Sequence, residues 1–252
     1  MAIHNKCGWL FVGSLHKIYC MKNVPVIMLL VVSCLLGPAV NAQEKTALNA
    51  DEFEQAIHKD SIQLLDVRTA AEYKAGHLEN SLLADWKDEK EFDRRIAFID
   101  KNKPVYVYCL GGSRSAAAAV KMRATGYAHV YELQGGINAW KAGNKMVEGK
   151  INEKQLSLAD AAKSINIPGF VLVDFGAEWC PPCKKMEPVI KHLQATNPGK
   201  FKLFKIDGGR DEDLMKQYNV TALPVFILFK NGKQVWRKDG IAEEKEIADL
   251  LH

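Results

Sequence analysis

The sequence lacks the features that would place it across a membrane or on a nucleic acid. Its longest apolar run, residues 26–36, is bracketed by prolines and is much shorter than the about 20 residues that a transmembrane helix needs. The first 42 residues contain no acidic side chain but three lysines, which supply most of the net charge of +4. The rest of the chain carries 31 of the 34 basic side chains against 30 acidic ones. This balance does not indicate a nucleic-acid-binding surface.

The same N-terminal segment resembles an export signal. Lys22 precedes the apolar run, and small residues ending at Ala42 follow it, which predicts cleavage after Ala42 (signal peptide 1–42) and a periplasmic protein. Met21 stands where such a signal would begin, so residues 1–20 are either an over-extended start or a long leader. Two alternatives stay open: an uncleaved N-terminus that anchors the chain in the membrane, and a lipid anchor on Cys34.

Cysteine is scarce, since the predicted cleavage leaves only Cys109, Cys180 and Cys183 of 6. An odd number excludes a fully paired disulfide framework, so in an oxidising compartment the unpaired cysteine is either buried and inert or reactive. The chain has no second C-x-x-C and no paired histidine near Cys180. A zinc site or a static disulfide is therefore the weaker interpretation, and we expect no metal.

Apolar segments alternate with amphipathic ones in two stretches, which predicts two α/β domains at residues 45–145 and 150–252. The mostly polar residues 142–156 separate them. The first domain is expected to have a parallel sheet with helices on both faces. Predicted strands cover residues 62–67, 104–109, 129–133, 170–175, 202–206, 225–229 and 234–237, the last after an Asn231-Gly232 hairpin turn. Predicted helices follow Asn49 and cover residues 87–99, 115–126, 181–195, 212–218 and 242–251.

The Cys180-Pro181-Pro182-Cys183 segment follows an apolar strand and opens a helix. Unpaired N–H groups and the helix dipole favour an anion there, and Cys180 is the sulfur most exposed to that field. Prolines suit the position because first-turn N–H groups have no acceptor within the helix. The spacing also lets Cys183 form a disulfide with Cys180.

Residues 150–252 resemble thioredoxin. The matching residues are Val173-Asp174-Phe175, Glu178 to Lys184 with Trp179, Pro188, Lys205, and Ala222-Leu223-Pro224. The resemblance implies that Cys180 is the attacking thiol and Cys183 the resolving one. It also implies that Asp174, with Lys205 nearby, carries the proton of Cys183, and that the Leu223–Pro224 bond is cis and faces the sulfurs. Gly176 departs from the family, which usually has a bulky residue there, so we expect looser packing.

Cys109 ends an apolar strand, and the following segment, Leu110-Gly111-Gly112-Ser113-Arg114-Ser115, leads into a helix. The glycines let successive N–H groups turn inward and form an anion nest, which a thiolate would occupy. Only about 3% of an ordinary thiol is ionised at pH 7. The nest and Arg114 are therefore expected to favour a reactive thiolate.

This loop and its flanks resemble a single-domain rhodanese, a sulfurtransferase. The other matching residues are Leu65-Asp66-Val67-Arg68, Glu72-Tyr73, Gly76-His77 and Gly135 to Trp140. The resemblance implies a persulfide on Cys109, cradled by the backbone of Leu110 to Ser115, with Arg114 orienting the loop or an anionic donor. It also implies that Asp66 and Arg68 form a structural pair beside the loop. The loop is one residue shorter than the related phosphatase loops, which argues against phosphatase activity.

The combined prediction is an exported thiol–disulfide oxidoreductase coupled to a sulfurtransferase domain. Its expected partners are disulfide-containing client proteins, a sulfane-sulfur donor and a membrane thiol reductase as the electron source, and no cofactor is expected beyond the redox disulfide and the persulfide. Leu110 departs from thiosulfate-using rhodaneses, many of which have a basic residue there. Two alternatives stay open: thioredoxin-only catalysis with the first domain recognising clients, and a sulfane-sulfur carrier without net redox chemistry.

Overall fold

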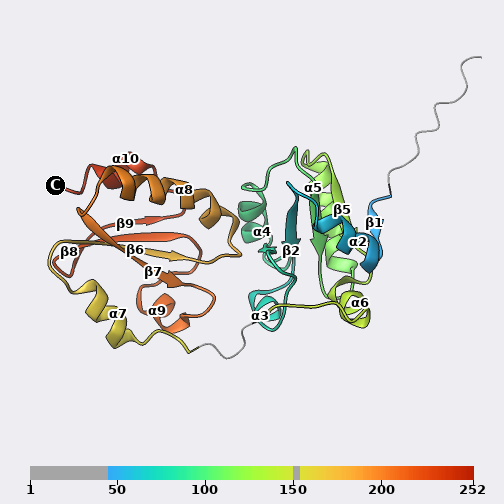
Figure 1. The fold of residues 1–252 in the computed structure, drawn as a ribbon, viewed down its shortest axis with the longest axis horizontal. Helices are drawn as coiled ribbons and strands as arrows, with labels where there is room; N and C mark the ends of the chain where they lie inside the picture. Colours follow the sequence, from blue (N-terminus) through green and yellow to red (C-terminus); the bar gives the residue numbers. More distant parts are fainter. Residues whose placement is uncertain (1–44, 150–153) are drawn as a thin grey trace, which may run out of the picture. The chain divides into compact units, whose positions relative to one another are not determined.

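The computed structural model describes residues 45–149 and 154–252 (Figure 1). The predicted signal peptide, its cleavage point and Cys34 lie outside the described residues. The described chain forms a five-stranded and a four-stranded sheet. None of the described helices is long and apolar enough to cross a membrane.

The first sheet is parallel throughout, with strand order β1-β5-β4-β2-β3. Its strands are β1 (Ala47–Leu48), β2 (Gln63–Asp66), β3 (Leu82–Leu83), β4 (Val105–Tyr108) and β5 (Val130–Leu133). Its helices are α2 (Ala50–Ile57), α3 (Ala70–Lys74), α4 (Glu89–Ile96), α5 (Ser113–Ala124) and α6 (Gly136–Ala142). The order places β4, which carries the chain to Cys109, in the centre of the sheet.

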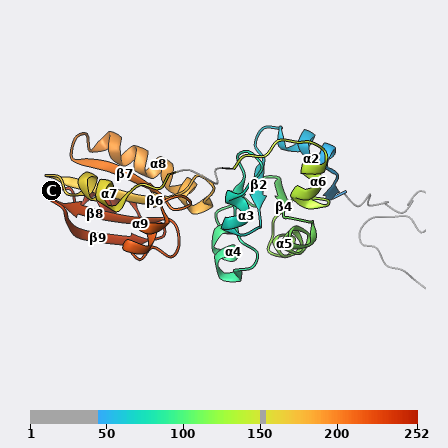
Figure 2. The same cartoon turned by 90° about the horizontal axis from the view of Figure 1, so that it is seen from below.

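Helices cover both faces of this sheet, as predicted (Figure 2). Alternate residues of a strand point to opposite faces. Val107 of β4 therefore packs in one core with α4 and α5, while its neighbour Tyr108 packs in the other core with α2 and α6. Both cores are apolar, and Cys109 belongs to the first of them.

The second sheet is mixed, with order β7-β6-β8-β9; β6 and β7 are parallel, and β8 and β9 are antiparallel to their neighbours. Its strands are β6 (Phe170–Gly176), β7 (Phe201–Asp207), β8 (Val225–Lys230) and β9 (Lys233–Asp239). Its helices are α7 (Leu158–Ile165), α8 (Pro181–Thr196), α9 (Glu212–Gln217) and α10 (Glu244–Ala248). α7 and α9 pack in one core of this sheet and α8 and α10 in the other.

Several local predictions are confirmed. Asn49 caps α2 in a full capping box with Glu52. Asn231 and Gly232 both have positive φ (51° and 76°), as a tight hairpin between β8 and β9 requires. α5 begins at Ser113, earlier than predicted, because Gly112 takes a left-handed conformation (φ 101°) and caps the helix.

Five short elements were not predicted: β1 and β3 with 2 residues each, α3 with 5, α6 with 7 and α7 with 8. The predicted helix at residues 242–251 is shorter, covering only Glu244–Ala248. Within the polar boundary segment, Glu148 still pairs with His77 of the first domain.

Candidate functional site

Cys109 lies immediately after β4, buried and free of any disulfide. The Gly112 N–H donates to Cys109 Sγ at 3.1 Å, and the Ser115 hydroxyl donates to it at 3.4 Å. Burial by itself raises the pKa of the thiol, but the Ser115 hydroxyl and the backbone N–H groups of Ser115, Gly112 and Gly111 outweigh it and lower the pKa below its usual value. The predicted nest therefore exists as a set of donors around the sulfur.

The N-terminus of α6 fixes this loop from outside. The Ile137 N–H donates to the Cys109 carbonyl at 2.8 Å, and the Asn138 N–H donates to the Leu110 carbonyl at 3.1 Å. Gly136 allows this approach, since a Cβ there would lie 2.5 Å from the Cys109 carbonyl oxygen. With its carbonyls held outward, the loop turns its N–H groups toward the sulfur. The sequence signal for this role is the Gly135-Gly136 pair.

Arg114 is tied to Glu72. Its guanidinium donates to both carboxylate oxygens of Glu72, at 2.9 and 2.6 Å, and these bonds are the main reason that the pKa of Glu72 falls to about 2. Glu72 also closes the capping box of α3 with Thr69. The ion pair therefore links the start of α5 to α3, and Arg114 makes no described hydrogen bond to Cys109.

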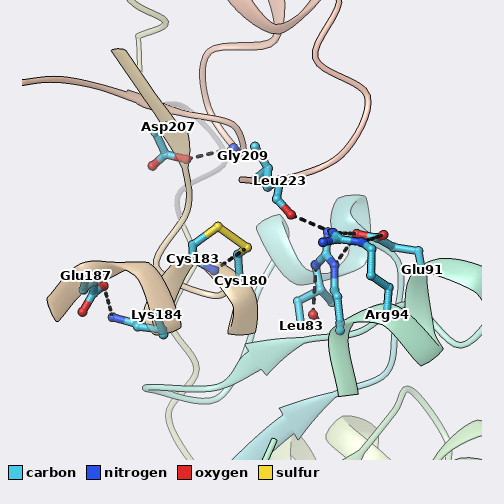
Figure 3. The surroundings of a disulfide bond; sticks show 11 residues. Leu83, Glu91, Arg94, Cys180, Cys183, Lys184, Glu187, Asp207, Gly209 and Leu223 are labelled. Carbon is cyan, nitrogen blue, oxygen red and sulfur yellow. Dashed lines mark hydrogen bonds and ion pairs between the residues drawn. A yellow bond between two sulfur atoms is a disulfide. The ribbon is translucent and has the colours of Figure 1, made fainter. Parts of the chain in front are cut away.

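Cys180 and Cys183 form a disulfide where β6 leads into α8 (Figure 3). Cys180 is the N-cap residue, and the Cys183 N–H donates to its Sγ at 3.3 Å. Pro181 and Pro182 occupy the first helical positions, where no N–H is needed. Reduction would place the Cys180 thiolate at the positive end of α8.

Asp174 lies on β6 in register with Lys205 of β7. Burial raises the pKa of Asp174 to about 6; Lys205 opposes the shift and Glu187 adds to it. Asp174 and Cys183 both line a cavity of about 290 Å³ that Gly176 and Lys205 also line. A Cβ on Gly176 would lie 3.3 Å from an Asp174 carboxyl oxygen and 3.8 Å from Cys183 Sγ, so a larger residue would fill this space.

Comparison with known proteins assigns both domains. A rhodanese-like domain model matches residues 49–143, and a thioredoxin model matches residues 155–252. The chain is 38% identical over 97 residues to a thioredoxin from Chlamydia trachomatis, covering 38% of this chain and 90% of that protein. It is 35% identical over 82 residues to a thioredoxin from Rickettsia felis, covering 32% and 78% respectively.

The chain belongs to the thioredoxin family, and a rhodanese-like domain precedes its thioredoxin domain. Among solved structures, a rhodanese-related protein from Thermoplasma volcanium is 26% identical, with a TM-score of 0.37 and coverage of 41% of this chain and 98% of that chain. A thioredoxin from Halobacterium salinarum is 30% identical, with a TM-score of 0.35 and coverage of 38% and 84%.

In the rhodanese-like domain, Asp66 and Arg68 form the predicted pair. Arg68 Nη2 donates to Asp66 Oδ2 at 2.6 Å and to the Gly76 carbonyl at 2.7 Å, and both side chains are buried. Burial raises the pKa of Asp66 even though Arg68 opposes the shift. The remaining loop residues, Leu110, Gly111 and Ser113, are exposed.

In the thioredoxin domain, the Leu223–Pro224 peptide bond is cis, as the resemblance implies. Trp179 is half-buried beside Cys180 and belongs with Leu223 to one core cluster. Within the described residues, no group of three or more His, Cys, Asp and Glu side chains could hold a metal ion.

Proposed function

We propose that the chain is an exported thiol–disulfide oxidoreductase whose rhodanese-like domain forms a persulfide and passes its sulfur to the thioredoxin domain. The observation that carries the proposal is the donor set around Cys109 Sγ, which favours an anionic sulfur. The same chain has a second position that favours an anionic sulfur, the start of α8, where Cys180 is the N-cap residue.

The thioredoxin half-reaction reduces a client disulfide. The Cys180 thiolate attacks one client sulfur, and the other client sulfur leaves as a thiolate. Cys183 then attacks the mixed disulfide, so that the client leaves as a dithiol and Cys180–Cys183 is oxidised by two electrons. Asp174, with a pKa of about 6, is suited to take the Cys183 proton near neutral pH.

The rhodanese half-reaction takes a sulfane sulfur. The Cys109 thiolate attacks the outer sulfur of a donor S–S bond, the remainder of the donor leaves as an anion, and Cys109 becomes a persulfide. The N–H groups of Gly111, Gly112 and Ser115 would stabilise its terminal anionic sulfur as they stabilise the thiolate. Arg114 would orient the loop through Glu72.

Coupling joins the two half-reactions. Cys180 takes the terminal sulfur from Cys109 and becomes a persulfide itself, and Cys109 leaves as a thiolate. Cys183 then attacks Cys180 Sγ, which releases hydrosulfide and forms the Cys180–Cys183 disulfide. One persulfide and one dithiol thus give one thiol, one disulfide and sulfide, and a membrane thiol reductase would restore the dithiol.

Two assays on the purified protein test the proposal. Incubation with a sulfane-sulfur donor should add one sulfur to Cys109, detected by peptide mass spectrometry, and the reduced protein should reduce insulin disulfides. Cys109→Ser should remove the persulfide but leave insulin reduction, whereas Cys180→Ser should remove insulin reduction and sulfide release. Absence of both activities in the unsubstituted protein would reject the proposal.

Leu110 favours a second candidate, in which only the thioredoxin domain is catalytic and the first domain recognises clients. Its side chain is 43% exposed, where a basic residue would attract an anionic donor. In that case Cys109→Ser would leave the turnover of physiological clients unchanged, and a large loss of turnover would reject it. A sulfane-sulfur carrier differs from both candidates, since its transfer would survive loss of Cys183.

A further inference from the structure

The redox disulfide is closed to a protein client in this conformation. Cys180 has no exposed surface, and Cys183 is 9% exposed. Disulfide exchange requires a thiolate to approach one sulfur in line with the S–S bond. Protein that covers Cys180 must therefore move before a client cysteine reaches it.

Residues of the rhodanese-like domain contact two backbone segments of the thioredoxin domain, one just before Cys180 and one just before cis-Pro224. The Leu83 N–H donates to the carbonyl of Trp179, the residue before Cys180, at 2.7 Å. Arg94 Nη2 donates at 2.7 Å to the carbonyl of Leu223, the residue before cis-Pro224. Figure 3 shows Leu83, Glu91 and Arg94 grouped on the Cys180 side of the disulfide.

β3 is well suited to such a contact because it is an edge strand of its sheet. Edge strands leave N–H and C=O groups unpaired, and these groups readily pair with another segment. The Leu83 N–H is therefore a donor that the first sheet leaves free, and the Trp179 carbonyl satisfies it.

Arg94 and Arg95, the two arginines of this contact, are held in place by groups of the first domain. Glu91 binds Arg94 Nε at 2.7 Å and Arg95 Nε at 2.6 Å, and Arg95 Nη1 donates to the Leu83 carbonyl at 2.9 Å. The Arg95 guanidinium lies 4.8 Å from the centre of the Trp179 ring and is buried. A charged group fixed by two partners and stacked on an indole forms an organised surface.

We propose that β3 and α4 of the rhodanese-like domain occupy the surface beside Cys180, formed by Trp179 and Leu223, at which the thioredoxin domain binds a client. A client must displace β3 and α4 from this surface before it reaches Cys180. The inference rests on the proposed oxidoreductase function. A competing client would offer the same groups: an extended segment with a free backbone N–H for the Trp179 carbonyl and a guanidinium for the Leu223 carbonyl.

Arg94→Ala in the full chain tests this occupancy. The protein is reduced, then treated with a small alkylating reagent, iodoacetamide, and with a bulky one, a polyethylene-glycol maleimide, and modification of Cys180 is followed by peptide mass spectrometry. Loss of one charged hydrogen bond should raise the rate of the bulky reagent at Cys180 about tenfold relative to that of iodoacetamide. Lys90→Ala is the control, since Lys90 is exposed on the same helix.

A second variant guards against a folding defect in the first. Lys74 pairs with Glu212 of the thioredoxin domain at 3.6 Å; the Lys74 side chain is 35% exposed and the Glu212 side chain 56%. Lys74→Glu places two carboxylates together, so it should also favour the bulky reagent at Cys180. Equal labelling ratios in all four proteins would overturn the inference.

Insulin reduction separates this inference from the proposed function. If Arg94→Ala and Lys74→Glu increase both the labelling of Cys180 by the bulky reagent and the rate of insulin reduction, the occupancy and the oxidoreductase proposal both stand. If they increase labelling while none of the proteins reduces insulin, the occupancy stands and the oxidoreductase proposal fails.

Discussion

Ser115→Ala is the substitution that most directly tests how this fold makes Cys109 reactive. The Ser115 hydroxyl donates both to Cys109 Sγ at 3.4 Å and to the Gly112 carbonyl at 3.0 Å. Its hydrogen bond is the first of the contacts that lower the Cys109 pKa against the effect of burial. Alanine removes this donor and leaves the backbone N–H groups in place.

The expected effect follows from the strength of the bond. A hydrogen bond to a charged group contributes about 1.5–3 kcal/mol, and this one is long and shared with Gly112, so about 1 kcal/mol of thiolate stabilisation should be lost. At a pH below the Cys109 pKa, that loss lowers the thiolate population about fivefold. The Cys109 pKa therefore moves upward.

Iodoacetamide reacts with the thiolate, so its rate at Cys109 measures this population. The rate is followed against pH by peptide mass spectrometry in the oxidised protein, where Cys180 and Cys183 are protected by their disulfide. Ser113→Ala is the matched control, since Ser113 is an exposed serine of the same loop. If Ser115→Ala and Ser113→Ala give the same pH profile as the unsubstituted protein, the hydroxyl does not stabilise the thiolate and the account of this site is wrong.

Three further predictions concern pH and backbone geometry. Asp174 has a folded-state pKa of about 6 against an ordinary 3.8, so the free energy of unfolding should fall by about 3 kcal/mol as pH rises through this range; Asp174→Asn should abolish this fall in urea titrations. Glu72 acts in the opposite direction, because its pKa falls from 4.5 to about 2. Ionised Glu72 therefore adds to the free energy of unfolding above about pH 4.5, and this contribution disappears as pH falls toward 2. Glu72→Gln should therefore narrow the difference in stability between neutral and acid pH, and an unchanged difference would contradict the role of the Arg114 pair. Gly136→Ala places a Cβ 2.5 Å from the Cys109 carbonyl oxygen, whereas Gly126→Ala, also at positive φ, meets no atom within 4 Å. Gly126→Ala should lower the free energy of unfolding by about 1 kcal/mol, and Gly136→Ala should lower it clearly more, as measured by the urea midpoints. Equal losses would refute the close approach of Gly136 to the Cys109 carbonyl.

Much of the fold and of the candidate site could be predicted from local sequence patterns. The capping box after Asn49, the Asn231-Gly232 turn and the apolar strands before Cys109 and Cys180 depend on neighbouring residues alone. Caps, turns and periodicity act over a few residues, so a single sequence carries them. For the same reason the two motifs indicated which sulfurs lie where a strand leads into a helix.

Only the tertiary structure decided which distant groups meet at those sulfurs. The pairing of Arg114 with Glu72 spans 42 positions, and the bond from Arg94 to the Leu223 carbonyl spans 129. Gly136 reaches the Cys109 loop because the order of the first sheet places β5 beside β4. Contacts of this kind depend on strand order, register and the packing of whole elements, which no local pattern encodes.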